Sequence, residues 1–548
     1  MGFCFSRFSE WTEVNPGPTA LPTGESTIHA SWKGSTGRKT QVFELLVVAC
    51  DPRDLTIENR TDLEKRVNDA LTSFVFKTSL FSAKRNNEDP YAVRFHPARL
   101  DRGDGSVYGF RDEVRARVNA KVLEEEPKEP NNTLVVAYQF SNQPFPRNAS
   151  DLKKEVARLD GLVEEAFESE PWLKPVTREK KLDGLHADYF PHFENPALEE
   201  GLPWQILESQ GSNSTLYTSS FCSFESVVHI FEYLEMLMAN IFISESLPKA
   251  MDAPILIVGA GPAGLLSARK LKKMGYTNIT ILEKSDRFGG KTKTVKKEIT
   301  LASGAKATIP CELGTCYLSP GYDSVLHLFE EYDAGRNFVL DSRGDRPLRA
   351  IVDVDLARDD EEKATGINMG EWIDRKSGSL GGGIWETLAD TFADAKAGVA
   401  IYRYNSLHRS IFGYVANHDL RPIPARRPDA SLFKQTFNEF LIAEGLEILT
   451  APFTYAYEVQ GYGNIENIPA YYGLVWLTPE VLSGVAKAAV LSTVQPGGNH
   501  GSVFATTQGW GTLWEKMVAK EEFNIIYNVT ISSLSRVPKL PVPAPAPE

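Results

Sequence analysis

Residues 254–290 read PILIVGAGPAGLLSARKLKKMGYTNITILEKSDRFGG and decide the fold. The apolar, β-branched run 255–258 is typical of a strand buried on both faces. Three glycines follow it at the spacing GxGxxG: Gly259, Gly261 and Gly264. A strand that turns directly into this pattern and then into a helix predicts a dinucleotide-binding site, whereas the glycines alone would be weak evidence.

Each glycine has its own expected role in such a turn. Gly259 lets the chain turn sharply, Gly261 lets a pyrophosphate approach the backbone, and Gly264 lets the following helix, expected over 263–274, pack closely on the strand. The pyrophosphate then faces a helix N-terminus, where free N–H groups favour an anion. The residues predicted to hold the cofactor in this turn are Gly259, Ala260, Gly261, Ala263 and Gly264.

A carboxylate stands at the expected distance from the glycines. The second strand, predicted over 278–282, ends on Glu283, 19 residues past Gly264. An acid at this place hydrogen-bonds the ribose 2′-OH of a bound dinucleotide. Glu283 and its neighbour Lys284 are therefore added to the predicted cofactor-binding residues.

The next residues, Arg287-Phe288-Gly289-Gly290-Lys291, distinguish flavin from nicotinamide. Here the chain resembles the flavin-containing amine oxidase superfamily, whose members follow the ribose-binding Glu with a Gly-Gly-basic element beside the FAD pyrophosphate. The resemblance implies FAD as the cofactor, with Gly289, Gly290 and Lys291 at the phosphates, and disfavours a nicotinamide-dependent dehydrogenase. Relatives usually carry Arg where this chain has Lys291, which supplies a point charge and not a bidentate fork.

Three later segments narrow the resemblance. Residues 311–323 (CELGTCYLSPGYD), the residues from Gly461 to Trp476 and the helix expected over 432–443 are similar to FAD-dependent polyunsaturated fatty acid double-bond isomerases. The resemblance covers residues 251–537. It implies that 312–317 pass close to the isoalloxazine ring and that Val529 holds the adenine side of FAD. The predicted substrate contacts are Tyr317, Tyr462 and Trp476.

The fold expected from these patterns is α/β, with a Rossmann-like FAD-binding domain that carries an inserted substrate-domain portion. An α+β domain precedes it. This domain resembles no recognised family, and its sequence indicates no function. The expected division is a flexible leader (1–39), the α+β domain (40–250), the FAD-binding domain (251–365 and 495–537), the substrate-domain portion (366–494) and a proline-rich tail (538–548).

The 40–250 region alternates between strand and helix patterns. We predict strands over 42–49, 92–95 and 133–140, and helices over 63–78 and 151–167. The run 224–243 is about as long as a bilayer span, but Glu232, Glu235 and His229 would be costly in hydrocarbon. A helix buried between the two halves of the protein is therefore the prediction, with membrane-surface contact as the alternative.

Composition excludes several classes of protein. The chain has 548 residues and a formal net charge of −13, without an extended basic patch, so no nucleic-acid partner is expected. Five cysteines show no CxxC pairing, which indicates neither a disulfide framework nor a zinc site. Residues 186–194 have metal-ligand types, but Phe and Pro between them favour a surface loop, and no metal is predicted.

No secretory signal is visible at the N-terminus, so a cytoplasmic location is expected. The first six residues, MGFCFS, match an acylation pattern in which Gly2 would be myristoylated and Cys4 palmitoylated. Membrane association through these lipids is an alternative to an ordinary disordered start. Oligomeric state stays open.

An apolar substrate would need a lined pocket and, for a fatty acid, a cation at its mouth. Residues 366–480 are rich in aromatic side chains, of which three or four are expected to face the ligand. The candidate carboxylate partners are Arg403, Arg409, Arg426 and Arg427.

The resemblance implies an FAD-dependent oxidoreductase or isomerase that transfers a hydride to flavin N5, with an unsaturated fatty acid as the expected substrate. No catalytic residue is singled out. In the relatives a further glycine-containing element follows the segment that matches 509–537, whereas here the proline-rich tail follows. We therefore expect the first 250 residues or a partner chain to compensate. The alternatives are an amine-oxidase-type oxidase and a non-catalytic binding or regulatory protein on a truncated flavoprotein scaffold.

Overall fold

The computed structural model describes residues 24–34, 37–85, 91–170, 181–319, 322–339, 349–351, 395–412, 423, 427–479, 481–482 and 504–539. Gly2, Cys4 and Arg426 lie outside these residues, as does much of the predicted substrate-domain portion.

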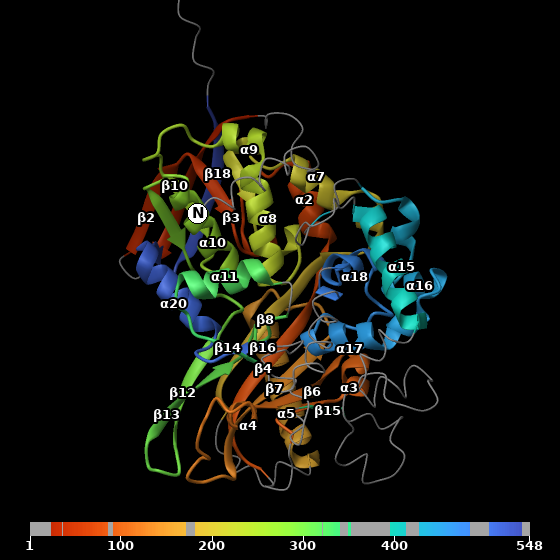
Figure 1. Ribbon diagram of the computed structural model, residues 1–548. Helices are drawn as coiled ribbons and strands as arrows, with labels where there is room; N and C mark the ends of the chain where they lie inside the picture. Colours follow the sequence, from red (N-terminus) through yellow and green to blue (C-terminus); the bar gives the residue numbers. More distant parts are fainter. Residues whose placement is uncertain are drawn as a thin grey trace, which may run out of the picture.

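The glycine motif belongs to a parallel sheet of five strands (Figure 1). Their order is β17 (Asn524–Ile526), β11 (Ile279–Leu282), β10 (Ile255–Val258), β3 (Leu45–Val48) and β9 (Thr215–Tyr217). All four neighbouring pairs are parallel. β3 and β9 come from the N-terminal half, so the predicted boundary at residue 250 divides one sheet. Periodicity identifies an apolar strand but does not tell which strand pairs with it.

Helices cover one face of this sheet, and a second, antiparallel sheet lies against the other. α10 (Pro262–Lys273) follows the glycine turn and packs between α8 (Val227–Ala239) and α20 (Trp510–Glu521). The antiparallel sheet has the order β18 (Thr530–Pro538), β1 (Ser26–Gly34) and β2 (Gly37–Phe43). In Figure 1 red, green and blue segments meet in this part of the molecule, so both ends of the described chain build it.

Two expected boundaries are wrong at this sheet. The leader was expected to run to residue 39, but β1 begins at Ser26, and its alternate residues Ile28, Ala30 and Trp32 are buried. This period-2 burial is that of a strand with one face in the core. Pro538, expected to open the tail, is the last residue of β18 and lies opposite Ser26.

The second large sheet has six strands and is built mostly from the N-terminal half. Its order is β15 (Arg349–Ile351), β5 (Val93–Phe95), β6 (Asp104–Asp112), β7 (Asn132–Ser141), β4 (Leu71–Lys84) and β8 (Lys181–Phe193). The strand predictions at 92–95 and 133–140 agree with β5 and β7, and the helix at 151–167 agrees with α5 (Ala149–Ser169). β15 contributes to this sheet from beyond residue 250.

Two local predictions fail in this sheet. The helix expected over 63–78 is α2 (Asp62–Ala70) followed directly by β4, because the β-branched and aromatic residues from Thr72 onward favour a strand. The surface loop expected at 186–194 is mostly strand β8, with Phe190 at a φ of 52° in the same stretch as a register shift against β4. Among the described residues no group of three or more potential metal ligands is found.

The apolar run 224–243 forms α8 and the short α9 (Ile241–Ser246), with Asn240 capping α9. α8 is buried against α10 and α11 (Asp323–Glu331), as expected for a helix between the two halves. The His229 ring nitrogen Nε2 lies 3.0 Å from the carbonyl oxygen of Val475, and burial lowers the pKa of His229 to about 4. Within the described part of the chain, no helix is long and apolar enough to cross a membrane.

The remaining elements complete the lower and right-hand parts of Figure 1. They are α3 (Pro97–Arg102), α4 (Glu113–Asn119), α6 (Asn195–Glu199), α7 (Leu202–Glu208), β12 (Thr294–Thr300), β13 (Lys306–Glu312), β14 (Asn337–Val339), α15 (Ala395–Phe412), α16 (Phe437–Ala443), α17 (Thr450–Gln460), α18 (Ala470–Trp476) and β16 (Phe504–Thr506).

The close packing of α10 on β10 gives a test of the fold. A Cβ at Gly264 would lie 1.9 Å from the carbonyl oxygen of Gly259, so Gly264→Ala must displace backbone. We expect a loss of about 3 kcal/mol in the free energy of unfolding, measured by urea denaturation. Gly161→Ala in α5 is the control, because no heavy atom lies within 4 Å of the new Cβ. It should gain about 1 kcal/mol from helix propensity. Equal stabilities for the two variants would contradict the packing.

Candidate functional site

β10 and β3 end side by side, at the position that is called the crevice of a doubly wound sheet. Gly259 has a φ of +103°, a conformation that favours glycine. A Cβ there would lie 3.3 Å from the carbonyl oxygen of Ala49 and 3.4 Å from Cβ of Cys50. The residues that follow β3 therefore form the second side of the glycine turn. In open α/β sheets this position, where the strand order reverses, is the place for a dinucleotide.

Two glycines leave the floor of the crevice bare. Gly261 precedes the first residue of α10, Pro262, and has no side chain to cap the helix. Only Gly290 Cα, at 3.8 Å, lies within 4 Å of a Cβ built on Gly261, and a Cβ on Gly290 would lie 3.0 Å from Gly261 Cα. After Pro262, which has no N–H, the first N–H groups of α10 have no partner within the helix and can bind an anion at this point. The cradle therefore fits a pyrophosphate.

The ribose-binding prediction for Glu283 fits the observed contacts. Its carboxylate accepts hydrogen bonds from the N–H of Ala260 at 2.8 Å and from the N–H and hydroxyl of Ser285 at 2.8 and 2.7 Å. A carboxylate has about four acceptor positions, so one remains for a ribose hydroxyl. Val529 is buried beside it and donates its N–H to the carbonyl oxygen of Glu283 at 3.0 Å. Lys284 instead points to Asp54, with 3.0 Å between Nζ and Oδ2.

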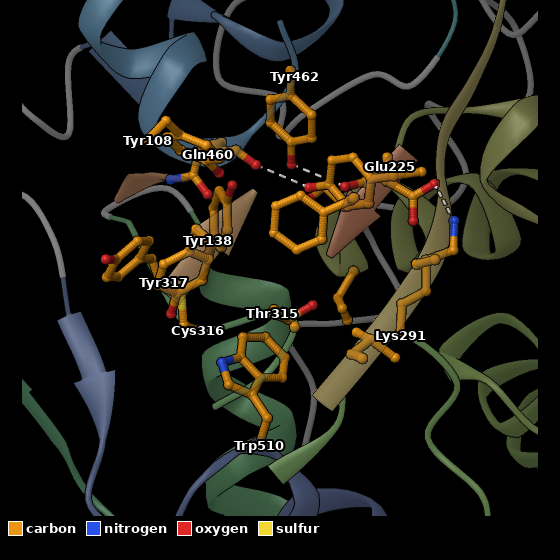
Figure 2. A pocket seen from close by; sticks show the side chains of 18 residues that line it. Tyr108, Tyr138, Glu225, Lys291, Thr315, Cys316, Tyr317, Gln460, Tyr462 and Trp510 are labelled. Atoms are coloured by element: carbon orange, nitrogen blue, oxygen red, sulfur yellow. Dashed lines mark hydrogen bonds and ion pairs between the residues drawn. The ribbon is translucent and has the colours of Figure 1, made fainter. Parts of the chain in front are cut away.

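The residue after Gly290, Lys291, lines a cavity. We call it the aromatic pocket; it has an empty volume of about 730 Å³, part of it open to solvent. Its walls come from both halves of the sequence (Figure 2). The lining residues are Phe76, Tyr108, Tyr138, Leu185, Ala187, Tyr189, Glu225, Ser226, Val227, Lys291, Gly314, Thr315, Cys316, Tyr317, Tyr322, Gln460, Tyr462 and Trp510. A lining of aromatic side chains with a few polar groups among them is typical of a small-molecule site.

Lys291 and Glu225 form an ion pair in the aromatic pocket, with 2.7 Å between Nζ and Oε2 (Figure 2). The same Glu225 oxygen accepts from the Ser220 hydroxyl at 2.9 Å and the Phe190 N–H at 3.2 Å. The ammonium lies 5.7 Å from the ring centre of Tyr189. Lys291 was predicted beside the phosphates; its ammonium is here paired with a carboxylate fixed by two other donors.

The structure separates the predicted substrate residues. Tyr317 and Tyr462 line the aromatic pocket, and the Tyr462 hydroxyl donates to the carbonyl oxygen of Glu225 at 2.9 Å. Trp476 is not among the lining residues; its ring centre lies 5.8 Å from that of Tyr462. Of the candidate carboxylate partners, Arg403 lies 3.5 Å from Glu444 with more than half of its side chain exposed. Neither it nor the other described candidates, Arg409 and Arg427, line the pocket.

The lining residues from the N-terminal half were missed by sequence reasoning. Tyr108, Tyr138 and Tyr189 come from β6, β7 and β8, and Glu225 precedes α8. Alternation along the predicted strand 133–140 could place Tyr138 on one face of a sheet. It could not show that this face meets the segment after Gly290.

A buried charged cluster lies against two tyrosines of the pocket. Arg111 pairs with Glu113 at 2.5 Å, and Arg117 pairs with the other Glu113 oxygen at 2.9 Å. The Arg111 guanidinium lies 5.6 Å from the ring centres of both Tyr138 and Tyr317. It also donates to the carbonyl oxygen of Glu312 at 3.1 Å. The cluster therefore holds two pocket tyrosines against the segment predicted to run beside the flavin.

Two buried polar atoms in the pocket lining lack a hydrogen-bond partner among the described residues. They are the Tyr138 hydroxyl and the Trp510 indole Nε1. Buried groups of this kind are normally satisfied, so each is available to a polar ligand. Together with the bare glycine cradle and the free position on Glu283, they fit a cofactor that has a nucleotide end, a pyrophosphate and a polar-edged ring. FAD has this form.

Glu312 gives the site a pH dependence. Its carboxylate accepts hydrogen bonds from the backbone N–H of Trp510 and from the Thr294 hydroxyl, both at 2.7 Å. Burial raises the pKa of Glu312 from 4.5 to about 7. An acid with a raised folded-state pKa holds more protons when folded, so stability falls as pH rises from about 4.5 to about 7. The loss approaches about 3 kcal/mol, since a tenfold change in proton affinity is about 1.4 kcal/mol.

We expect Glu312→Gln to remove this dependence, because the amide keeps the shape and carries no charge. Urea denaturation at pH 5 and pH 8 measures the change in each protein. The wild type should lose more stability over this interval than the variant does. Glu515→Gln, at an exposed side chain paired with Lys296, is the control and should behave as the wild type. A variant with the wild-type pH dependence would rule out Glu312 as its source.

Comparisons with known proteins find a matching family and several relatives. The family described as flavin containing amine oxidoreductase matches residues 262–539. The polyenoic fatty acid isomerase of Ptilota filicina is 22% identical over 272 residues, 48% of this chain and 47% of that protein. Lysine-specific histone demethylase 2 of Homo sapiens is 26% identical over 255 residues, 44% of this chain and 30% of that protein.

A similar solved structure is a CLA-producing fatty acid isomerase from P. acnes, 20% identical, with a TM-score of 0.33. The alignment covers 53% of this chain and 58% of that one. Among the curated relatives named above, the match covers 47% of the isomerase and 30% of the demethylase, so this chain spans about half or less of their length.

Proposed function

Because this chain belongs to the flavin containing amine oxidoreductase family, with FAD as its cofactor, we propose that it transfers a hydride between FAD and a small hydrophobic substrate held in the aromatic pocket. The observation that carries the proposal is the continuity of the site. Gly290 lies against Gly261 in the phosphate cradle, and the next residue, Lys291, lines the pocket. A cofactor bound along the crevice would therefore extend from the cradle towards the pocket.

FAD, when bound, supplies the acceptance and return of a hydride. The residues of the chain bind it, orient the substrate and exclude water. The tyrosine-rich walls offer a largely apolar lining for a substrate carbon chain. Among the described residues that line the pocket, Lys291 is the one cation, and its side chain is about one-third exposed. An acidic substrate would exchange its carboxylate for Glu225 at this ammonium.

We propose an unsaturated fatty acid as the substrate class, because an apolar chain and one carboxylate match an aromatic cavity with one cation. A second candidate is a primary amine, which would bind Glu225 in place of Lys291. The Tyr189 ring lies 5.7 Å from the ammonium that Glu225 binds, and its face would favour a bound cation as well. Each substrate class therefore depends on a different member of the same ion pair.

The visible spectrum tests the cofactor. The wild-type chain incubated with FAD and desalted should keep flavin bands at one flavin per chain. Gly261→Val should fold and lose them, because the protein leaves room for the added Cβ whereas a pyrophosphate does not. Gly34→Val, where no heavy atom lies within 4 Å of the Cβ, should keep them. Full flavin binding by folded Gly261→Val would remove the phosphate cradle from the proposal.

Anaerobic addition of substrate tests the reaction. We expect linoleic acid to yield the near-ultraviolet absorbance of a conjugated diene, with any bleaching of the flavin reversed as product forms. Oxidation of an amine would instead bleach the flavin until air is admitted, with release of hydrogen peroxide. The matched variants Lys291→Gln and Glu225→Gln should weaken acid and amine binding respectively. A flavin-loaded chain inert to both classes would favour the non-catalytic alternative.

A further inference from the structure

The strands of the parallel sheet follow the chain in an unusual order. A doubly wound dinucleotide fold has the spatial order 3-2-1-4-5, numbered along the chain. Here β17, β11 and β10 occupy the places of strands three, two and one. β3 and β9 occupy the places of strands four and five, yet they precede strand one in the sequence. The spatial arrangement is ordinary, whereas the order along the chain is rotated.

The antiparallel sheet shows where the rotation falls. β17 leads within a few residues to β18, and β2 leads within one residue to β3. Between them, β18 pairs antiparallel with β1, from Ser26 opposite Pro538 to Lys33 opposite Thr530. A path from strand three to strand four therefore runs β17, β18, β1, β2, β3. Each step follows the chain except the step from β18 to β1, whose adjoining ends lie opposite each other.

We infer that this chain is a circular permutation of a doubly wound FAD-binding fold, in which residues 24–250 supply the second wall of the cofactor site. The inference rests on the proposed function for the identity of the ligand. Close ends are the condition under which a fold tolerates a rotated order.

The N-terminal segment reaches the site at two places. The first follows β3, where Ala49 and Cys50 lie against Gly259, as described above, with the Cys50 side chain partly exposed. The second follows β9, where Glu225, Ser226 and Val227 line the aromatic pocket. In a doubly wound sheet both places lie at the carboxyl ends of the strands, which is where the ligand binds.

Two further polar groups after β9 support a ligand on this side. The hydroxyls of Ser219 and Ser223 are buried, with the residues 6% and 4% exposed. Neither hydroxyl has a hydrogen-bond partner among the described residues. Ser220, between them, donates to Glu225, so this segment also positions the carboxylate of the pocket.

The first test places the same large side chain at two positions of the full chain. Cys50→Trp places an indole beside Gly259 and should raise the FAD Kd by at least about tenfold, whereas Val399→Trp, at an exposed side chain of α15, should stay within about threefold of the wild type. Calorimetric titration of each apoprotein with FAD measures the values, and circular dichroism confirms the fold. Equal Kd values for Cys50→Trp and wild type would overturn the second wall at Cys50.

Hydrogen exchange tests the same contacts in the wild-type chain, so it does not depend on the folding of the Cys50→Trp variant. FAD added to the wild-type chain should slow exchange in peptides that span 49–55 and 219–229, as well as in those that contain the glycine motif. Protection confined to residues after 254 would overturn the inference while leaving FAD binding, and so the proposed function, intact. Absence of any FAD binding would instead contradict the proposed function.

The permutation itself can be tested without a ligand. A rearranged gene that encodes residues 251–548 followed by 1–250 begins at Met251, in an exposed turn, and leaves the native tails as the linker between β18 and β1. We expect this protein to be soluble, with the wild-type far-ultraviolet spectrum and a melting midpoint within a few degrees. An unfolded or aggregated product would overturn the permutation.

Discussion

The pairing of β10 with β3 is the constraint on which the site depends. Four residue pairs, from Ile255 opposite Leu45 to Val258 opposite Val48, join segments about 200 residues apart in one buried parallel ladder. These strands are fully or almost fully buried, so their register is strongly specified by packing. Because both strands end at the same edge, Gly259 meets Cys50 there, and the crevice exists only when both halves are folded together.

The same interleaving explains the pocket. β4, β6, β7 and β8 bring aromatic residues from the N-terminal half over the segment that follows Gly290. The start of α8 and the residues just before it close the cavity, at Val227 and Glu225. The Arg111–Glu113–Arg117 cluster then fixes Tyr138 and Tyr317 from behind. An ion pair in the lining, Lys291 with Glu225, joins one residue from each half. The aromatic pocket therefore forms only when the N-terminal half is folded against the rest of the chain.

Sequence reasoning was strongest where a pattern is local. The unit from Gly259 to Glu283 could be predicted because strand, turn, helix and acid follow one another at fixed spacing. Gly259 has a conformational reason and Gly264 a steric one in the structure. The family and cofactor followed from the same residues. The boundary of the helix at 63–78 failed because apolar residues continue across the change from α2 to β4, and only the β-branched and aromatic types signal it.

The pairing of segments that lie far apart in the sequence could not be predicted. The run at 42–49 was identified as a strand, but nothing in LLVV indicates that it pairs with a strand 200 residues later. Tyr189 and Glu225 carry no motif, since their importance comes from the sheet that places them beside Lys291. The prediction of a separate domain over 40–250 failed for this reason.

The most direct measurement is an experimental structure of the full chain with FAD bound. We expect the pyrophosphate to lie between Gly261 and Gly290, the ribose at Glu283, and the flavin ring to extend into the aromatic pocket, with contacts to both Cys50 and the 219–227 segment. A cofactor held only by residues after 254, with the N-terminal half apart from it, would contradict a site built from both halves.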